Sequence, residues 1–262
     1  INADGRYVTF QSESSNLVPG DGNGTSSSFN GIDIFVFDTL TETIKRVSAS
    51  NAAMEANDRS SSPSLSSDGR YVVFESYASN LVPDDNNNSL DVFLYDAETE
   101  TIRRVSVNDA NIEGNGHSLT PSISSNGRYV TFVSAASNLV AGDNNSQFDV
   151  FIYDSVMNVI QRVSASDAGI EGNGRSVDQS ISADGRYVTF ASKASNLILR
   201  DINRVEDIFI APNPLIAPNL IRVNLEAGQV VSDLNFGLIP DPGSIRGRVF
   251  EDSVPNGAYD DG

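Results

Sequence analysis

One phrase of the sequence constrains its fold more than any other. It reads Asp-Gly-Arg-Tyr, or Asn-Gly-Arg-Tyr, and is followed by a short apolar run that ends in Phe. The four copies begin at Asp4, Asp68, Asn126 and Asp184. Successive copies are therefore 64, 58 and 58 residues apart. Because a unit of this length is too small to bury its own apolar face, neighbouring units must stack on one another.

A second marker, Arg-Val-Ser, has the same period. Its copies begin at Arg46, Arg104 and Arg162. The first unit has six extra residues, and these lie between Asp21 and Asp33, because the corresponding pairs of the next two units are only six positions apart. We expect one loop to contain this insertion and the strands around it to keep their register.

The second unit illustrates the strands that each repeat predicts. A tight turn at 67–69 joins a short extended piece, 63–66, to the β-branched and aromatic run 70–74. Further strands are predicted at 91–96 and 101–107. Four short antiparallel strands and no helix, repeating at about 40 to 60 residues, are typical of β-propeller blades. A β-sandwich is the alternative, although sandwiches rarely repeat their sequence strand by strand.

Composition excludes several classes of function. The 35 acidic and 17 basic residues give a formal charge of −18, which repels nucleic acid and anionic membrane surfaces and favours divalent cations. The absence of Cys excludes disulfides, iron–sulfur clusters and thiolate zinc sites. No apolar stretch approaches the roughly 18 residues of a membrane span. We therefore expect no nucleic-acid partner and no membrane insertion by this part of the protein.

The complete cycle of motifs resembles the TolB-type, WD-like propeller repeats of bacterial periplasmic and secreted proteins. The resemblance covers about residues 1–210 and includes Asp-x-Phe-x-Tyr-Asp and Thr-Ile-x-Arg-Val-Ser, both of which are complete in the second unit. It implies an all-β fold of about four blades, with units near 1–62, 63–120, 121–178 and 179–225. Such rings usually contain roughly six to eight blades. The resemblance therefore implies a partial ring from a longer, secreted or cell-surface bacterial protein.

The loop before the third strand of each unit carries acidic and amide residues at a constant spacing, Asp-x-Asn-x3-Asp, which the insertion interrupts in the first unit. Its members are Asp21, Asn23, Asp33, Asp85, Asn87, Asp91, Asp143, Asn145, Asp149, Asp201, Asn203 and Asp207. Calcium takes six to eight oxygen ligands, which such a loop can supply. The alternative is that these are turn residues whose side chains bond their own backbone. We predict calcium at these loops, whereas a single His and no Cys disfavour zinc.

Catalytic motifs are scarce in this chain. The only histidine, His117, lies in a second polar loop that recurs in each unit, and Arg59 and Arg175 occupy the same position in the neighbouring units. We interpret His117 as a variant of a repeated structural position. No Gly-x-Ser-x-Gly elbow or phosphate-binding loop is present. Paired carboxylates in the channel, as in a hydrolase or lyase, stay open as an alternative.

The repeat pattern ends near residue 210. A Pro-rich linker is predicted at 211–219, followed at 220–262 by a terminal β segment and the start of a second module. Residues 243–262, with Gly-x-Val-Phe-x-Asp and Asn-Gly-x-x-Asp, resemble the opening of the B-type domains of serine-aspartate-repeat adhesins. That resemblance implies a calcium loop containing Asp252, Asn256 and Asp260, in which Val254 replaces a polar residue.

The repeats, the acidic loops and the scarcity of catalytic motifs together favour a binding function over an enzymatic one. The favoured function is a non-catalytic, calcium-supported scaffold that binds a protein or carbohydrate ligand outside the bacterial cytoplasm. The alternative is a propeller hydrolase or lyase with channel carboxylates, or an accessory propeller of a separate catalytic domain. Uniform blades favour the scaffold, whereas polar residues that break the repeat and converge at one channel mouth favour the enzyme.

Overall fold

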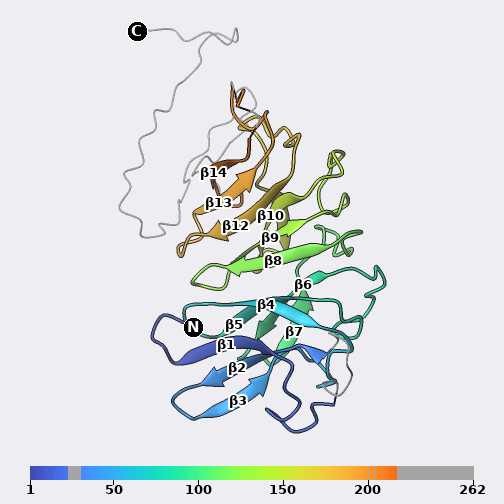
Figure 1. Cartoon of the computed structure of the whole chain (residues 1–262), viewed down its shortest axis with the longest axis vertical. Coiled ribbons are helices and arrows are strands. Elements are labelled where there is room, and N and C mark those ends of the chain that lie inside the picture. Colours follow the sequence, from blue (N-terminus) through green and yellow to red (C-terminus); the bar gives the residue numbers. More distant parts are fainter. Residues whose placement is uncertain (23–30, 200, 204, 217–262) are drawn as a thin grey trace, which may run out of the picture. The chain divides into compact units, whose positions relative to one another are not determined.

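The computed structural model describes residues 1–22, 31–199, 201–203 and 205–216. Within these residues the chain forms fourteen β-strands and no α-helix. The strands form four antiparallel sheets that follow one another in sequence order (Figure 1). The prediction of an all-β fold made of blades is therefore confirmed, and we call the four sheets blades 1 to 4.

The blades share one topology, in which each strand pairs with the next along the chain. Blade 1 contains β1 (Tyr7–Ser12), β2 (Asp33–Asp38) and β3 (Thr43–Arg46). Blade 2 contains β4 (Ser60–Leu65), β5 (Tyr71–Ser76), β6 (Asp91–Asp96) and β7 (Thr101–Arg104). Blade 3 contains β8 (Ser118–Ile123), β9 (Tyr129–Ser134), β10 (Asp149–Asp154) and β11 (Val159–Arg162). Blade 4 contains β12 (Ser176–Ile181), β13 (Tyr187–Ser192) and β14 (Asp207–Pro212).

Each blade has an aromatic face and an aliphatic face, because side chains alternate across a strand. In blade 2 the aromatic face includes Phe74, Phe93 and Tyr95, and the aliphatic face includes Val92 and Leu94. The aliphatic face of each blade packs on the aromatic face of the next one, which forms three hydrophobic clusters between the four blades. The core of this protein therefore lies between the sheets.

The Asp-Gly-Arg-Tyr phrase joins neighbouring blades. In its first three copies the Arg forms an ion pair with the Asp that ends the next strand of the same blade, which is β2, β6 or β10, and lies over the ring of the following Tyr. Its Tyr ring covers the turn glycine of the next blade. The three pairs are Tyr7 with Gly69, Tyr71 with Gly127 and Tyr129 with Gly185. The phrase therefore has a structural role.

A few polar side chains break the repeat and bond backbone atoms in the first strand of a neighbouring blade. The amide of Ser62 donates to Gln11 Oε1 (3.0 Å), and the amide of Thr120 donates to Glu75 Oε2 (2.6 Å). Gln179 Nε2 donates to the carbonyl of Thr120. These groups bond backbone atoms of the adjacent blade, so they fix how the blades stack.

The predicted segments after residue 210 are only partly within the described residues. β14 extends to Pro212, which places the first two residues of the predicted linker 211–219 in an edge strand. The predicted segment 220–262, including Asp252, Asn256 and Asp260, lies outside the described residues. In the part of the chain that the structure describes, no helix is long and apolar enough to cross a membrane.

Candidate functional site

Three groups of acidic side chains recur at the same place in successive units. Each group combines the two predicted loop aspartates with a glutamate from the loop before the next blade. The groups are Asp21, Asp33 and Glu55; Asp85, Asp91 and Glu113; and Asp143, Asp149 and Glu171. In each group one carboxylate oxygen from every residue lies within 4.8 Å of the others. The predicted aspartates therefore do come together in groups that could hold a metal ion.

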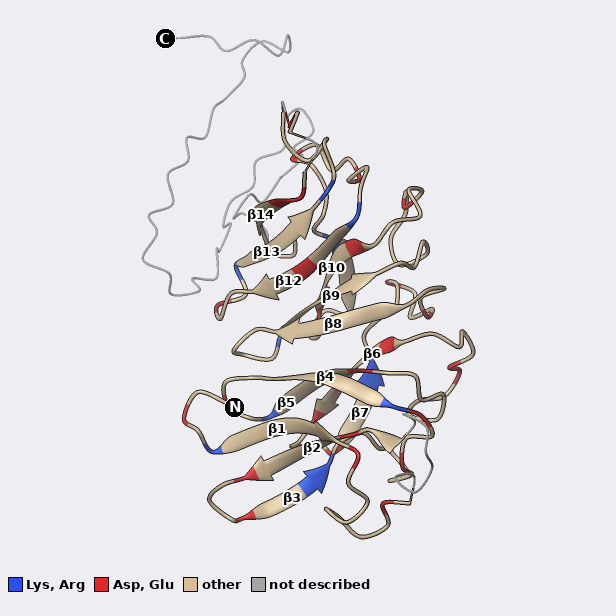
Figure 2. Cartoon of the chain, viewed as in Figure 1, with Lys and Arg blue, Asp and Glu red and all other residues tan. Residues whose placement is uncertain are grey.

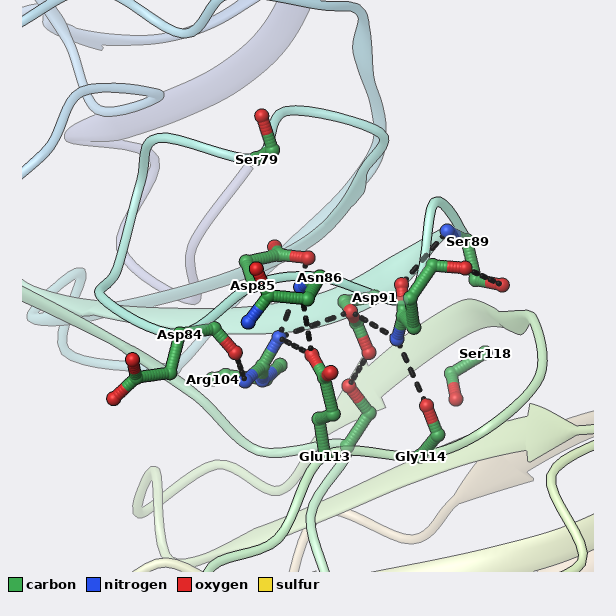
Figure 3. A network of polar contacts seen from close by, with 12 residues as sticks. Ser79, Asp84, Asp85, Asn86, Ser89, Asp91, Arg104, Glu113, Gly114 and Ser118 are labelled. Carbon is green, nitrogen blue, oxygen red and sulfur yellow. Dashed lines mark hydrogen bonds and ion pairs between the residues drawn. The ribbon is translucent and has the colours of Figure 1, made fainter.

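An arginine lies inside each group. In the second group, Arg104 Nη1 is 2.8 Å from Glu113, 3.3 Å from Asp91 and 3.5 Å from Asp85 (Figure 3). Arg46 and Arg162 make the same three contacts at 2.8–3.8 Å and 3.1–3.9 Å in the other groups. The position that a cation would take among these carboxylates is thus already shared by an internal guanidinium.

Hydrogen bonds orient the second aspartate of each group. Ser106 Oγ donates to Asp91 Oδ1 (2.5 Å), and Asn87 Nδ2 donates to Asp91 Oδ2 (2.9 Å) and to the carbonyl of Gly114 (2.8 Å). The amide oxygen of Asn87 accepts from the backbone N–H of Ser89 at 2.7 Å. Asn87 therefore presents its nitrogen to the acidic group, while its oxygen closes the loop.

The acidic groups retain an excess of negative charge, since three carboxylates surround one guanidinium. Burial raises the pKa of Asp85 to about 6, and the neighbouring Asp91 adds to the rise while Arg104 opposes it. Burial likewise raises the pKa of Asp143 to about 7 and that of Asp21 to about 6. The guanidinium therefore compensates only part of the cost of keeping these carboxylates charged.

The raised pKa values predict an unusual dependence of stability on pH. A carboxyl whose pKa is higher in the folded state binds its proton more tightly there, so its protonation stabilises the fold. We expect the thermal midpoint to rise as the pH is lowered from 8 to 5, as Asp85 and Asp143 are protonated. Asp143→Asn should reduce the rise. A midpoint that falls steadily over this range would contradict the prediction.

The fourth predicted site differs from the other three. Asn203 Nδ2 donates to both oxygens of Asp207, at 3.1 and 2.9 Å. A buried oxygen of Asp201, Oδ1, has no hydrogen-bond partner among the described residues. No third acidic residue of the described chain completes this group. Asn23 of the first predicted site lies outside the described residues.

The glutamates and arginines of the acidic groups were not predicted as site residues. Arg46, Arg104 and Arg162 were visible only as part of a repeat marker, and the glutamates only as part of a polar loop. The signal that would have found them is their recurrence with the same period as the aspartates. Figure 2 shows Asp and Glu distributed mainly over loops and strand ends of all the blades.

His117 has a structural environment, as its repeated position predicts. Its Nδ1 accepts a hydrogen bond from the backbone N–H of Leu90 (3.0 Å). Its ring makes an edge contact with Tyr77, at 5.7 Å between centroids. Both contacts link His117 to blade 2.

A cavity of about 410 Å³ lies between blades 1 and 2, lined among others by Lys45, Arg70 and Tyr95. Tyr95 is buried, and its hydroxyl has no hydrogen-bond partner in the described part of the chain. At the next junction the corresponding hydroxyl, that of Tyr153, donates to Asn158 (3.0 Å), and Arg103 extends over the Tyr153 ring. Lys45 occupies the position of Arg103 at the junction of blades 1 and 2, and its side chain is shorter than that of Arg103.

The chain matches no protein-family model and no curated protein sequence. Among solved structures it is similar to TolB from Acinetobacter baumannii, with 17% identity, a TM-score of 0.39, and coverage of 70% of this chain and 36% of that one. A TolB-type protein from Agrobacterium tumefaciens gives 14% identity and a TM-score of 0.47, with coverage of 75% and 53%. An oligogalacturonate lyase from Vibrio parahaemolyticus gives 13% identity and a TM-score of 0.40, with coverage of 74% and 45%.

The structural neighbours thus include TolB-type β-propeller proteins at low identity. The chain spans between about a third and a half of the length of these three proteins. The assignment to propeller blades itself comes from the strand pairing and the packing between sheets described above.

Proposed function

We propose that this chain is part of a non-catalytic binding scaffold of a secreted or cell-surface bacterial protein. One observation carries the proposal: the acidic groups, which are the most reactive clusters of side chains, recur with the same residue types in the first three units, each with its own arginine. A catalytic site needs groups placed once, at one position. The polar residues that do break the repeat, Gln11, Glu75 and Gln179, hydrogen-bond neighbouring blades.

The ligand of this scaffold is proposed to be a protein or a carbohydrate. The cavity between blades 1 and 2 supports this, because the charged side chains of Lys45, Arg70 and Glu98 line it and can bond polar ligand atoms. A cavity of about 410 Å³ falls within the usual size range of ligand pockets. No specific observation favours the alternative of a hydrolase or lyase.

We further propose that calcium reinforces the acidic groups. Their donor set suits it, since each group offers three carboxylates and calcium prefers oxygen ligands. With one guanidinium, each fully ionised group keeps two excess negative charges, which attract a divalent cation. Because the guanidinium lies 2.8–3.9 Å from the carboxylates, calcium must displace it or bind the outer carboxylate oxygens.

A calcium titration followed by thermal unfolding tests this proposal. An ion bound only by the folded state must stabilise it, so millimolar calcium should raise the midpoint and a chelator should lower it. The double variant Asp143→Asn with Asp149→Asn should lose part of the response. A matched control is Glu42→Gln with Asp167→Asn, which removes two exposed charges outside the groups. An unchanged midpoint in calcium and in chelator would refute calcium support.

A further inference from the structure

The cavity between blades 1 and 2 lies where the repeat changes. Lys45 and Tyr95 both line this cavity of about 410 Å³, and their counterparts at the junction of blades 2 and 3 are Arg103 and Tyr153. Both junctions lie between two blades that the structure describes. The difference between them therefore comes from these side chains and not from the absence of a covering blade.

Arg103 fills the corresponding space at the second junction. Its guanidinium carbon lies over the Tyr153 ring, 5.8 Å from the centroid. Nη1 donates to Asn158 Oδ1 (2.6 Å), and Nη2 donates to the carbonyl of Ser155 (2.5 Å). Blade 3 thus holds the guanidinium with an aromatic face and two oxygen acceptors, which are contacts that a guanidinium favours.

The first junction keeps the ring and the acceptors but lacks the guanidinium. Lys45 Nζ lies 5.6 Å from the centroid of the Tyr95 ring and donates to Glu100 Oε1 (2.6 Å). An ammonium is compact and cannot fill the area of a planar guanidinium. Val36 enlarges the space further, because it replaces the longer Leu94 of the second junction. Lys45 and Glu100 are 49% and 71% exposed, so a ligand can push this weak ion pair aside.

The charges around the cavity differ from those of the second junction. Five carboxylates and three cations line the cavity or form ion pairs with residues that do. They are Asp38, Asp68, Asp96, Glu98 and Glu100, and Arg6, Lys45 and Arg70. At the same eight positions of the second junction, Asn126, Val156 and Asn158 replace three of the carboxylates, and all three cations are arginines. Two carboxylates and three cations remain there, so the formal charge is +1 at the second junction and −2 at the first. The first junction therefore attracts a cationic ligand.

We propose that this cavity binds an arginine side chain of a partner polypeptide. Binding at this site rests on the proposed scaffold function and gives its ligand a defined chemical group. The guanidinium of the ligand lies over the Tyr95 ring and donates to Glu100 and to the carbonyl of Ala97. These groups occupy the same positions in the repeat as the groups that hold Arg103. Ala97 and Glu98 line the cavity and are exposed, so the ligand side chain enters from solvent.

Titration of the whole chain with N-acetyl-arginine amide, followed by calorimetry and by ¹H–¹⁵N NMR, tests the proposal. One probe should bind per chain with a Kd of about 1 mM, which suits a ligand of this size. The backbone amide signals of Ala97 and Glu98 should shift. N-acetyl-citrulline amide has nearly the same shape without the charge. It should bind about tenfold more weakly, because it cannot compensate the excess carboxylates.

Lys45→Arg should close the site from within. The new guanidinium would occupy the cavity as Arg103 occupies the next junction, so probe binding should weaken by about tenfold or more while the thermal midpoint does not fall. Lys193→Arg is the matched control, because Lys193 is exposed just after β13 and its replacement should leave binding unchanged. Glu98→Gln with Glu100→Gln keeps the shape of the rim but removes two charges, and it should weaken binding of the arginine probe by about tenfold.

The other outcomes separate this site from the general binding function. Equal binding of the two probes, or unchanged arginine binding in Lys45→Arg, would overturn the arginine site. If N-acetylglucosamine binds the wild type but not Lys45→Arg, and the arginine probe does not bind, the arginine site is also overturned, but the cavity stays a ligand site of the scaffold. If neither the arginine probe nor the sugar binds, the cavity supports neither this proposal nor a ligand for the scaffold.

Discussion

Replacing Arg104 with alanine should lower the free energy of unfolding by about 3–5 kcal/mol. The Arg104 side chain is 8% exposed, and its Nη1 contacts Asp85, Asp91 and Glu113. Removing it leaves three carboxylates close together with no neutralising charge. Urea unfolding of the wild type and the variant at neutral pH measures the difference.

The same variant should depend on calcium more strongly than the wild type does. Without the guanidinium, a divalent cation can enter the group and replace the lost positive charge, so calcium should restore part of the stability. Lys45→Ala is a control for removing a cation, because Lys45 and its partner Glu100 are both exposed, at 49% and 71%. That change should cost no more than about 1 kcal/mol. An Arg104→Ala loss as small as this would show that the arginine is not the main compensating charge.

Replacing Gly127 with alanine should cost about 3 kcal/mol or more. Gly127 has φ of +72°, where an L-residue costs roughly 1–2 kcal/mol, and the added Cβ would fall within the ring of Tyr71. Gly142→Ala measures the backbone cost without the clash. Gly142 has φ of +77°, and no atom lies within 4 Å of the place that its added methyl group would take. This substitution should cost only about 1 kcal/mol.

A double variant separates the clash from the backbone strain. If the Tyr71 ring is the obstacle, Gly127→Ala should cost much less in a Tyr71→Ala background than in the wild type. Urea unfolding of the four proteins gives this interaction energy directly. Equal losses for Gly127→Ala and Gly142→Ala would show that the ring moves freely aside, and that the stacking of Tyr71 on the turn does not hold the blades together.

The period predicted the units and most strands, because it depends on local sequence. The run 70–74 and the run 91–96 correspond to β5 and β6, since β-branched and aromatic residues suit strands buried on both faces. The predictions were less accurate where strands lack such residues. β4 begins at Ser60 instead of residue 63, because its serines pair with β5 across an irregular register. β7 ends at Arg104, before the predicted end at 107.

The candidate site was predicted only in part. The constant spacing identified Asp85 and Asp91 because both lie in one loop that repeats. It could not identify Glu113 or Arg104 as their partners, since these residues lie in other segments. The antiparallel pairing of β6 with β7 places Arg104 opposite Phe93, and the bridge between Val107 and Glu113 folds the next loop back.

The array of β-blades with acidic loops at a fixed position follows from the order of the residues, because composition and period are properties of the chain. Which side chains surround those acidic residues depends on how the blades fold. How far one charge compensates another depends on the distance between them. The antiparallel strand pairing places Arg104 among three carboxylates from two different loops.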